Sequence, residues 1–220
     1  AYTVPTGLTA TYGSTLADVA LPTGWDWDVP NTSVGDVGEN PFSAAFTPDD
    51  AKNYNTVTEN LTVTVSAKDI SNAEITLGEA LTYTGQEQTH QITSVTVDGL
   101  TVTYTVTDST GTDAGDYTLT VTGTGNFTGE ATQGWSIAKA DYTGATGVSG
   151  SVLANWTNKV TLPVIPAGAS YGDPSTDDDL TGLSITGNIL SFTGGASITE
   201  GQKYEITVPV NGGKNYENYT

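Results

Sequence analysis

The sequence contains no cysteine, no methionine and no arginine, and histidine occurs once. The absence of cysteine excludes disulfide bridges, thiolate metal sites and cysteine nucleophiles. Long apolar runs are also missing, and none approaches the roughly 18 residues that a membrane-spanning helix needs. We therefore expect no membrane insertion of this part of the chain.

Positive charge is scarce. Six lysines stand against 25 acidic residues, which gives a formal net charge of −19 over 220 residues. A nucleic-acid binder needs a basic surface to displace counterions from phosphate, so this class is excluded. An acidic and well-solvated surface resists self-association, so we expect a monomer.

Threonine is abundant, with 41 copies, and there are 26 glycines. Threonine is β-branched and favours strands. Acidity, missing cysteine and abundant Thr, Gly and Asn are typical of secreted bacterial proteins. We expect an extracellular location at the cell surface or cell wall; an acidic cytosolic protein is the alternative.

One pattern occurs three times: a glycine, an alternating strand, a polar loop, and then asparagine followed by an aromatic residue. The copies are Gly38–Phe46 with Asn53-Tyr54, Gly115–Val121 with Asn126-Phe127, and Gly201–Val208 with Asn215-Tyr216. Their spacing exceeds the period of roughly 20–50 residues that solenoid repeats show. We therefore predict three tandem modules, at residues 1–67, 68–139 and 140–220.

The joints between these modules are Ser66–Asp69 and Ala138–Asp141. They are short and contain no glycine or proline, which favours semi-rigid connections. In the first two copies another strand follows the Asn-aromatic pair, at residues 60–65 and 131–137. Only four residues follow Tyr216. We expect the third module to be truncated at its last strand; the alternative is that it closes differently.

Apolar and polar residues alternate along most of the chain, as in residues 61–65, 100–107, 117–121 and 204–210. This alternation predicts half-buried strands with threonine outward. Asp98-Gly99 between two such runs predicts a type I′ hairpin. Helix signal is confined to one turn after Ser14, which could cap it.

The predicted fold class is all-β, with three small tandem β-sandwich modules of immunoglobulin-like type. A β-grasp-like module with one short helix is the alternative for residues 1–67. The segment 113–117 has the spacing of a tyrosine corner, in which the Tyr117 hydroxyl bonds to backbone upstream. Tyr204 fits the same place, whereas the first module has Asn40 there.

Several short segments of the first two modules carry a resemblance to known repeats. They are Thr11–Val19, Leu21-Pro22, Gly24-Trp25, Val34-Gly35, Tyr54 and Thr56-Val57 in the first module, and Leu81–Gly85, Val97–Gly99, Asp113–Gly115 and Gly123–Phe127 in the second. With these segments, the first module resembles repeats in large surface proteins of Gram-positive gut bacteria, and the second resembles their MBG-type repeats. The resemblance covers roughly residues 8–139 and implies an extracellular, non-catalytic module of an adhesin or cell-wall protein, with no catalytic residues to transfer.

Catalytic chemistry has little support in the residues. A serine triad needs a histidine, and His90 is the one available. It lies in a polar segment at the start of a predicted strand, and the sequence contains no Gly-x-Ser-x-Gly motif. We expect His90 to be an exposed strand residue, and we predict no enzyme. No cofactor is required, and calcium is the one ion to consider.

The weak metal candidates are Asp173, Asp177, Asp178 and Asp179, because acidic loops can supply the oxygen ligands that Ca²⁺ takes. Their spacing does not match an EF-hand, and solvated loops are the favoured interpretation. Asp49-Asp50 is a second and weaker candidate for a calcium site.

The weak ligand-binding candidates are Trp25 and Trp27. Trp25-Asp26-Trp27-Asp28 places both indoles on one face of a strand and both carboxylates on the other. Exposed indoles could stack on sugar rings, whereas buried ones would fill the core of a small domain. We favour the core, and expect Trp135 and Trp156 in the core or at joints.

The sequence therefore predicts a non-catalytic stalk or spacer of a bacterial surface protein, with some contribution to adhesion. The alternative is a carbohydrate- or mucin-binding module that uses Trp25 and Trp27 on a host glycan.

Overall fold

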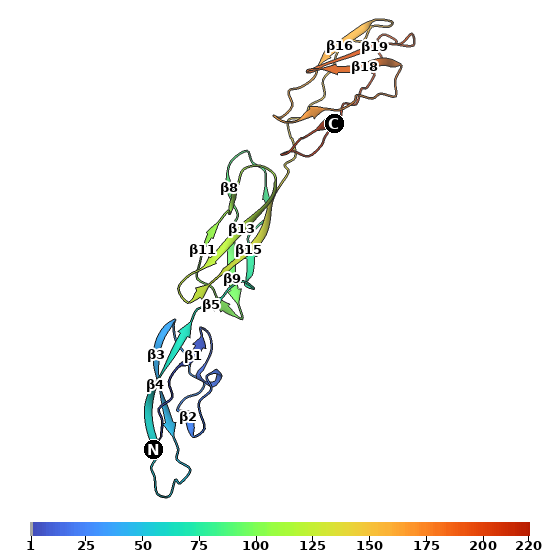
Figure 1. The fold of residues 1–220 in the computed structure, drawn as a ribbon. Coiled ribbons are helices and arrows are strands. Elements are labelled where there is room, and N and C mark those ends of the chain that lie inside the picture. The colour runs from blue at the N-terminus through green and yellow to red at the C-terminus, as the bar shows by residue number, and fades with distance from the viewer. Residues whose placement is uncertain (1) are drawn as a thin grey trace. The chain divides into compact units, whose positions relative to one another are not determined.

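The structure is a computed structural model that describes residues 2–220, and its regular structure is almost entirely β (Figure 1). The all-β prediction is confirmed. Contacts divide the chain into two compact units. Unit 1 comprises Ala1–Glu79, His90–Ser109 and Thr118–Gly134, and unit 2 comprises Ala80–Thr89, Thr110–Tyr117 and Trp135–Thr220. Within residues 2–220, no helix is both long and apolar enough to cross a membrane.

Unit 1 contains a four-stranded sheet in the order β1-β4-β3-β2. Its strands are β1 (Leu8–Thr11), β2 (Trp25–Trp27), β3 (Gly38–Phe46) and β4 (Val57–Ser66). β1 runs parallel to β4, and the other pairs are antiparallel. Along β4, Leu61, Val63 and Val65 are buried while the threonines between them are exposed, so the alternation in the sequence sets which face is buried. Figure 1 shows β3 and β4 side by side in this sheet.

The core of this part of unit 1 is aromatic and aliphatic. Trp25 and Trp27 lie on the buried face of β2 while Asp26 between them is exposed. Trp27 donates its indole N–H to the Val19 carbonyl at 2.9 Å. This bond gives a partner to the one polar atom of the indole, which would otherwise be buried without a hydrogen bond. The buried members of the cluster are Leu16, Val19, Trp25, Trp27, Val34, Ala44, Leu61, Val63 and Val65.

The single helical turn predicted after Ser14 is present as the 3₁₀ helix η1 (Leu16–Asp18). Its cap is Thr15, not Ser14. The Thr15 backbone N–H and hydroxyl both donate to Asp18 Oδ2, at 2.8 and 3.1 Å. An acidic side chain three positions on can satisfy the free N–H of the cap residue, so Asp18 fixes the start of the turn.

The remaining strands of unit 1 include a hairpin at Asp98-Gly99. The antiparallel strands that flank the turn are β9 and β10, and φ is 48° at Asp98 and 79° at Gly99, as a type I′ turn requires. This prediction is confirmed. The strands are β5 (Lys68–Asp69), β6 (Glu74–Leu77), β9 (Ile92–Val97), β10 (Leu100–Thr101), β11 (Tyr104–Thr107) and β14 (Phe127–Thr128).

Two strands contribute residues to both units, β13 (Gly115–Gly123) and β15 (Glu130–Ala138). Their sheet has the order β11-β13-β15-β7, where β7 (Leu81–Thr82) runs parallel to β15. The first sheet of unit 1, when written as β2-β3-β4-β1, has the corresponding strand order. In both sheets the strand that comes first in the chain runs parallel to the strand that comes last. The same sheet topology therefore occurs twice in the chain.

The rest of unit 2 has a separate aliphatic cluster around Leu162, Leu180, Leu190 and Phe192. It lies on a sheet in the order β16-β19-β18, in which neighbouring strands are antiparallel. The strands of unit 2 not yet named are β8 (Gln88–Thr89), β12 (Thr110–Gly111), β16 (Thr157–Thr161), β17 (Ser170–Tyr171), β18 (Leu180–Thr186), β19 (Ile189–Gly194) and β20 (Val210–Asn211).

Because Trp27 is buried and Trp156 is exposed, replacing each with alanine should lower the free energy of unfolding by different amounts. Trp27→Ala should lower the free energy of unfolding by about 3–5 kcal/mol, because it opens a cavity and removes the bond to the Val19 carbonyl. Urea denaturation followed by far-ultraviolet circular dichroism measures this loss.

Trp156→Ala is the matched control. Trp156 is 66% exposed, and surface substitutions change stability by no more than about 0.5 kcal/mol. Equal losses in the two variants would contradict the assignment of Trp27 to the core.

Candidate functional site

The two tryptophans proposed to stack on sugars are core residues. Trp25 is 5% exposed and Trp27 is 9% exposed. The Trp25 ring contacts Phe46 with centroids 5.5 Å apart, and the Trp27 ring contacts Phe42 at 6.3 Å. Their ring faces are covered by the fold, so a sugar cannot stack on them. Trp135 is buried as predicted, whereas Trp156 is exposed, contrary to prediction.

Two of the acidic candidates Asp173, Asp177, Asp178 and Asp179 make hydrogen bonds to other loops. Asp178 Oδ2 accepts a hydrogen bond from the Glu205 backbone N–H at 2.6 Å. Asp179 Oδ2 accepts from the hydroxyl and the backbone N–H of Ser197, and these bonds lower the pKa of Asp179. Among residues 2–220 no group of three or more His, Asp or Glu side chains could hold a metal ion. These two carboxylates instead fix loops to one another.

His90 is buried, at 6% exposure, and the prediction of an exposed strand residue was wrong. Its backbone N–H donates to the Ser109 carbonyl at 2.8 Å, and its ring Nδ1 lies 3.3 Å from the Gln91 carbonyl. The polar residues on either side of His90 suggested exposure, but the backbone pairing with Ser109 turns this residue inward.

The contacts that stand out are made by Asn126. Its Oδ1 accepts the backbone N–H of Val37 at 2.9 Å, and its Nδ2 donates to Asp36 Oδ1 at 2.8 Å. One amide side chain thus binds both the carboxylate and the following N–H of the turn Asp36-Val37-Gly38. All these residues belong to unit 1. We call this arrangement, an asparagine amide on an Asp-x-Gly turn, an asparagine clamp.

Unit 2 contains a second asparagine clamp with the same atoms. Asn215 Oδ1 accepts the backbone N–H of Ala114 at 2.8 Å, and Asn215 Nδ2 donates to Asp113 Oδ1 at 3.0 Å. The turn bound here is Asp113-Ala114-Gly115. Lys214 adds an ion pair to the free oxygen, Asp113 Oδ2, at 2.8 Å.

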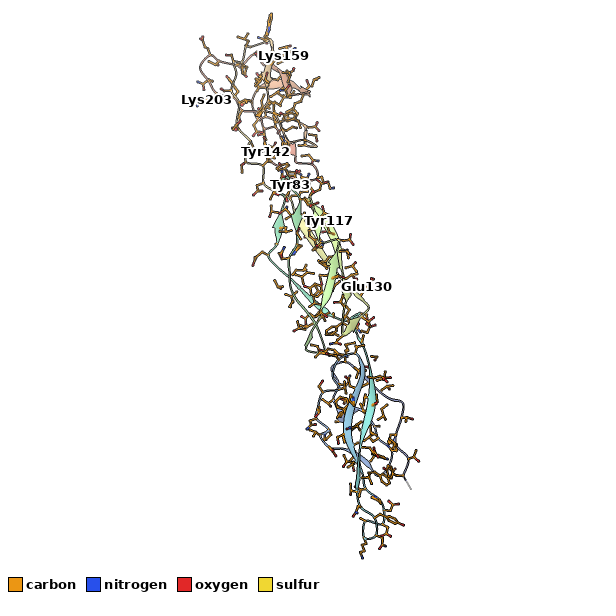
Figure 2. All side chains as sticks on the ribbon, turned by 90° about the vertical axis from the view of Figure 1, so that its left-hand side faces the viewer. Tyr83, Tyr117, Glu130, Tyr142, Lys159 and Lys203 are labelled. Carbon is orange, nitrogen blue, oxygen red and sulfur yellow. The ribbon has the colours of Figure 1, made fainter. Side chains whose placement is uncertain are left out.

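The two clamps share their surroundings. The aromatic residue after each asparagine meets a tyrosine edge to face, Phe127 with Tyr12 and Tyr216 with Tyr83, with ring centroids 5.4 Å apart in both cases. Tyr142 also contacts Tyr216, at 5.7 Å, and Figure 2 shows Tyr83 and Tyr142 close together. Each clamp therefore combines a polar contact with an aromatic one.

Backbone pairing accompanies both clamps. The carbonyl of Asn126 accepts the Lys68 N–H at 2.9 Å, where β14 pairs in parallel with β5, and the carbonyl of Asn215 accepts the Ala140 N–H at 3.0 Å. Lys68 and Ala140 lie in the segments predicted as joints. An asparagine clamp thus ties three separate chain segments together through one residue.

Glycine is needed at the third position of each turn. Gly38 has φ of 131° and Gly115 has φ of 149°, a region that residues with a Cβ atom rarely adopt. The turns are also held from within: Asn40 Nδ2 donates to the Asp36 carbonyl at 2.7 Å, and the Tyr117 hydroxyl donates to the Asp113 carbonyl at 2.7 Å. The Tyr117 bond to backbone upstream is confirmed, and Asn40 makes the equivalent bond in unit 1.

Tyr204 does not repeat this bond. Its hydroxyl accepts the Thr199 backbone N–H at 2.8 Å, so it acts as an acceptor where Tyr117 is a donor. The corresponding turn, Thr199-Glu200-Gly201, has threonine in place of aspartate. This turn therefore lacks the carboxylate that an asparagine clamp binds.

A cavity of about 1180 Å³ lies within unit 2, lined in part by residues 145–154, Val160 of β16 and the segment 198–206. Several lining residues, such as Leu162, Leu190 and Phe192, belong to the aliphatic cluster of this unit. The cavity is thus a gap in the packing over that cluster, and we assign it no ligand.

Both asparagines belong to the Asn-aromatic pairs that repeat in the sequence, and both turns contain the glycine of the same repeat. The sequence did not show that they meet. The clamp pairs lie 89 and 101 residues apart, which no local pattern can report.

Comparisons with known proteins add little. The chain matches no protein-family model and no curated protein. Among solved structures, it is similar to an endo-fucoidan hydrolase of glycoside hydrolase family 107, MfFcnA4, and to a variant of that enzyme. Each match has 12% sequence identity and a TM-score of 0.23, and covers 91% of this chain and 36% of the other. The chain thus spans about a third of the length of these structures.

The second clamp predicts a low pKa for Asp113. The Lys214 ammonium, and then the Asn215 amide, donate to the Asp113 carboxylate and lower its pKa below the ordinary value. A lowered pKa means that the clamp contributes stability above the ordinary aspartate pKa, and that this contribution is lost as the pH falls through the lowered value. Carboxyl ¹³C NMR titration should place the Asp113 midpoint below that of a free aspartate.

Lys214→Ala should raise the Asp113 midpoint toward the ordinary value, whereas Lys203→Ala, which removes an exposed lysine elsewhere in unit 2, should leave it unchanged. An Asp113 midpoint that does not respond to Lys214→Ala would show that the ion pair is not formed in solution.

Proposed function

We propose that the chain is a non-catalytic spacer of an extracellular bacterial surface protein, built from three β modules at residues 1–67, 68–139 and 140–220. Its role is mechanical, because it holds other parts of the protein at a distance from the cell wall. The observation that carries this proposal is the repeated asparagine clamp, because both clamps bind residues on either side of a proposed module boundary.

The chemistry of the clamp suits a joint. The asparagine amide offers one donor and one acceptor in fixed geometry, so it orients the turn as well as binding it. The edge-to-face aromatic contact and the parallel backbone pairing add further constraints. Such a set of contacts opposes bending at the boundary, which is what a spacer requires.

The repeated sheet topology supports modules of one type. In both four-stranded sheets the first strand runs parallel to the last, and the third strand begins just after an Asp-x-Gly turn. We infer an immunoglobulin-like sandwich with a corner before that strand. The mixed sheet and the turn η1 would also suit the β-grasp alternative, but the shared strand order favours one fold for both.

The alternatives to a spacer, which are ligand binding and catalysis, have less support from the residues. Carbohydrate or mucin binding depended on exposed indoles at Trp25 and Trp27, and both are buried. The composition and the buried single histidine favour a protein without catalysis. We propose that the chain acts at the cell surface as a monomer.

Distances between spin labels test the joints directly. The chain has no cysteine, so paired cysteines can be labelled uniquely, at Val29 and Ser94 for the first joint and at Asp116 and Val164 for the second. Pulsed electron resonance should give a narrow distance distribution for each pair. Asn126→Ala should broaden the first distribution and Asn215→Ala the second, because each removes both hydrogen bonds of its clamp.

Asn72→Ala, at an exposed asparagine outside the clamps, should change neither distribution. Broad distributions in the unmodified chain would mean that the boundaries are flexible, and the proposal of a mechanical spacer would then fail.

A further inference from the structure

The residues that form the second clamp occur a further time. Lys214-Asn215-Tyr216 has the same sequence as Lys52-Asn53-Tyr54. Each of the three residues makes its own contact in the clamp. The lysine pairs with Asp113 Oδ2, the asparagine binds Asp113 Oδ1 and the Ala114 N–H, and the tyrosine contacts the Tyr83 ring. The earlier copy therefore contains every side chain that the clamp uses.

The earlier copy is exposed. Lys52 and Asn53 are solvent-exposed, and Tyr54 is 65% exposed. By contrast, Phe127, at the same place in the first clamp, is 5% exposed because it packs on Tyr12. In both clamps the aromatic residue after the asparagine packs on a tyrosine ring, so Tyr54 is the copy whose ring lacks the cover that its equivalents have.

Asn53 already holds a carboxylate. Its Nδ2 donates to Asp50 Oδ2 at 2.8 Å, within its own loop. In both clamps the same amide nitrogen donates to the aspartate of the bound turn. An incoming carboxylate would take the place of Asp50 at this donor.

We propose that Lys52, Asn53 and Tyr54 form a third docking surface, which binds the Asp-x-Gly turn of a further β module of the same type. The proposal rests on the proposed function, since it assigns to this surface the joint that the other two clamps make. The bound turn would offer a carboxylate to Lys52 and Asn53 and a backbone N–H to Asn53 Oδ1. The module that carries the turn would offer a tyrosine ring to Tyr54, as Tyr12 and Tyr83, which lie outside the turns, do in the two clamps.

A second copy of this chain is a poor occupant. The sequence contains two Asp-x-Gly segments, at residues 36–38 and 113–115, and each is already bound by an asparagine clamp. The equivalent turn at 199–201 has no aspartate. The partner must therefore be a module that carries a free Asp-x-Gly turn, which this chain does not offer.

The probe is a peptide with the sequence of residues 110–118, closed into a ring by added terminal cysteines, so that it presents a free Asp-Ala-Gly turn. It is titrated into the ¹⁵N-labelled full chain. Saturable chemical-shift changes should appear at the Lys52, Asn53 and Tyr54 amides and at the Asn53 side-chain amide. A peptide with asparagine in place of the aspartate should bind at least tenfold more weakly, because the charged acceptor is gone.

Two variants of the full chain complete the test. Asn53→Ala should abolish the shifts, and Asn55→Ala, at an exposed asparagine two residues on, should retain them. Short linkers give effective concentrations of about millimolar, so a contact that serves a joint must be detectable with millimolar peptide.

Absence of shifts at millimolar peptide, or equal binding of the aspartate and asparagine peptides, would overturn the third docking surface. The spin-label distances at the other two joints decide the proposed function separately. If Asn126→Ala and Asn215→Ala broaden them while the peptide fails to bind, the spacer stands and only the docking surface is lost.

Discussion

The structure depends on a single kind of contact, a neutral amide that holds a carboxylate and a backbone N–H at once. An amide side chain carries its donor and its acceptor in one plane, so the two bonds fix both distance and angle. The bond to a carboxylate is charge-assisted and is the stronger of the pair. Around this contact an aromatic edge, a parallel backbone pair and, at Asp113, a lysine are brought into place. The clamp brings together segments that lie far apart in the sequence.

Local features of the fold were predictable from the sequence. Alternation along residues 61–65 and 117–121 reports which side of a strand is buried, because the side-chain period of a strand is two. The Asp98-Gly99 hairpin follows from the positive φ that both residues tolerate. The Tyr117 bond follows from its spacing after Gly115. In each case the cause lies within a few residues of the effect.

Features set by distant contacts were not predictable. Nothing near Asn126 indicates that its partner is Asp36, and the repeat alone suggested separate domains without showing what joins them. The polar neighbours of His90 favoured exposure, but pairing of its backbone with Ser109 buries it. Trp156 has the size of a core residue and yet is exposed. For Asn126 and His90, pairing between segments distant in the sequence decided the outcome.

The middle position of the Asp-x-Gly turn contributes only its backbone N–H, and it is valine in one clamp and alanine in the other. The clamp therefore depends on the main-chain conformation of the turn and on one carboxylate, and it does not depend on the side chain of the middle residue. In the spacer that we propose, a junction with so few sequence requirements is compatible with exchange of the modules on either side of it. Duplication or loss of a whole repeat by recombination would leave a working junction behind, so the length of such a spacer could change between generations without compensating substitutions.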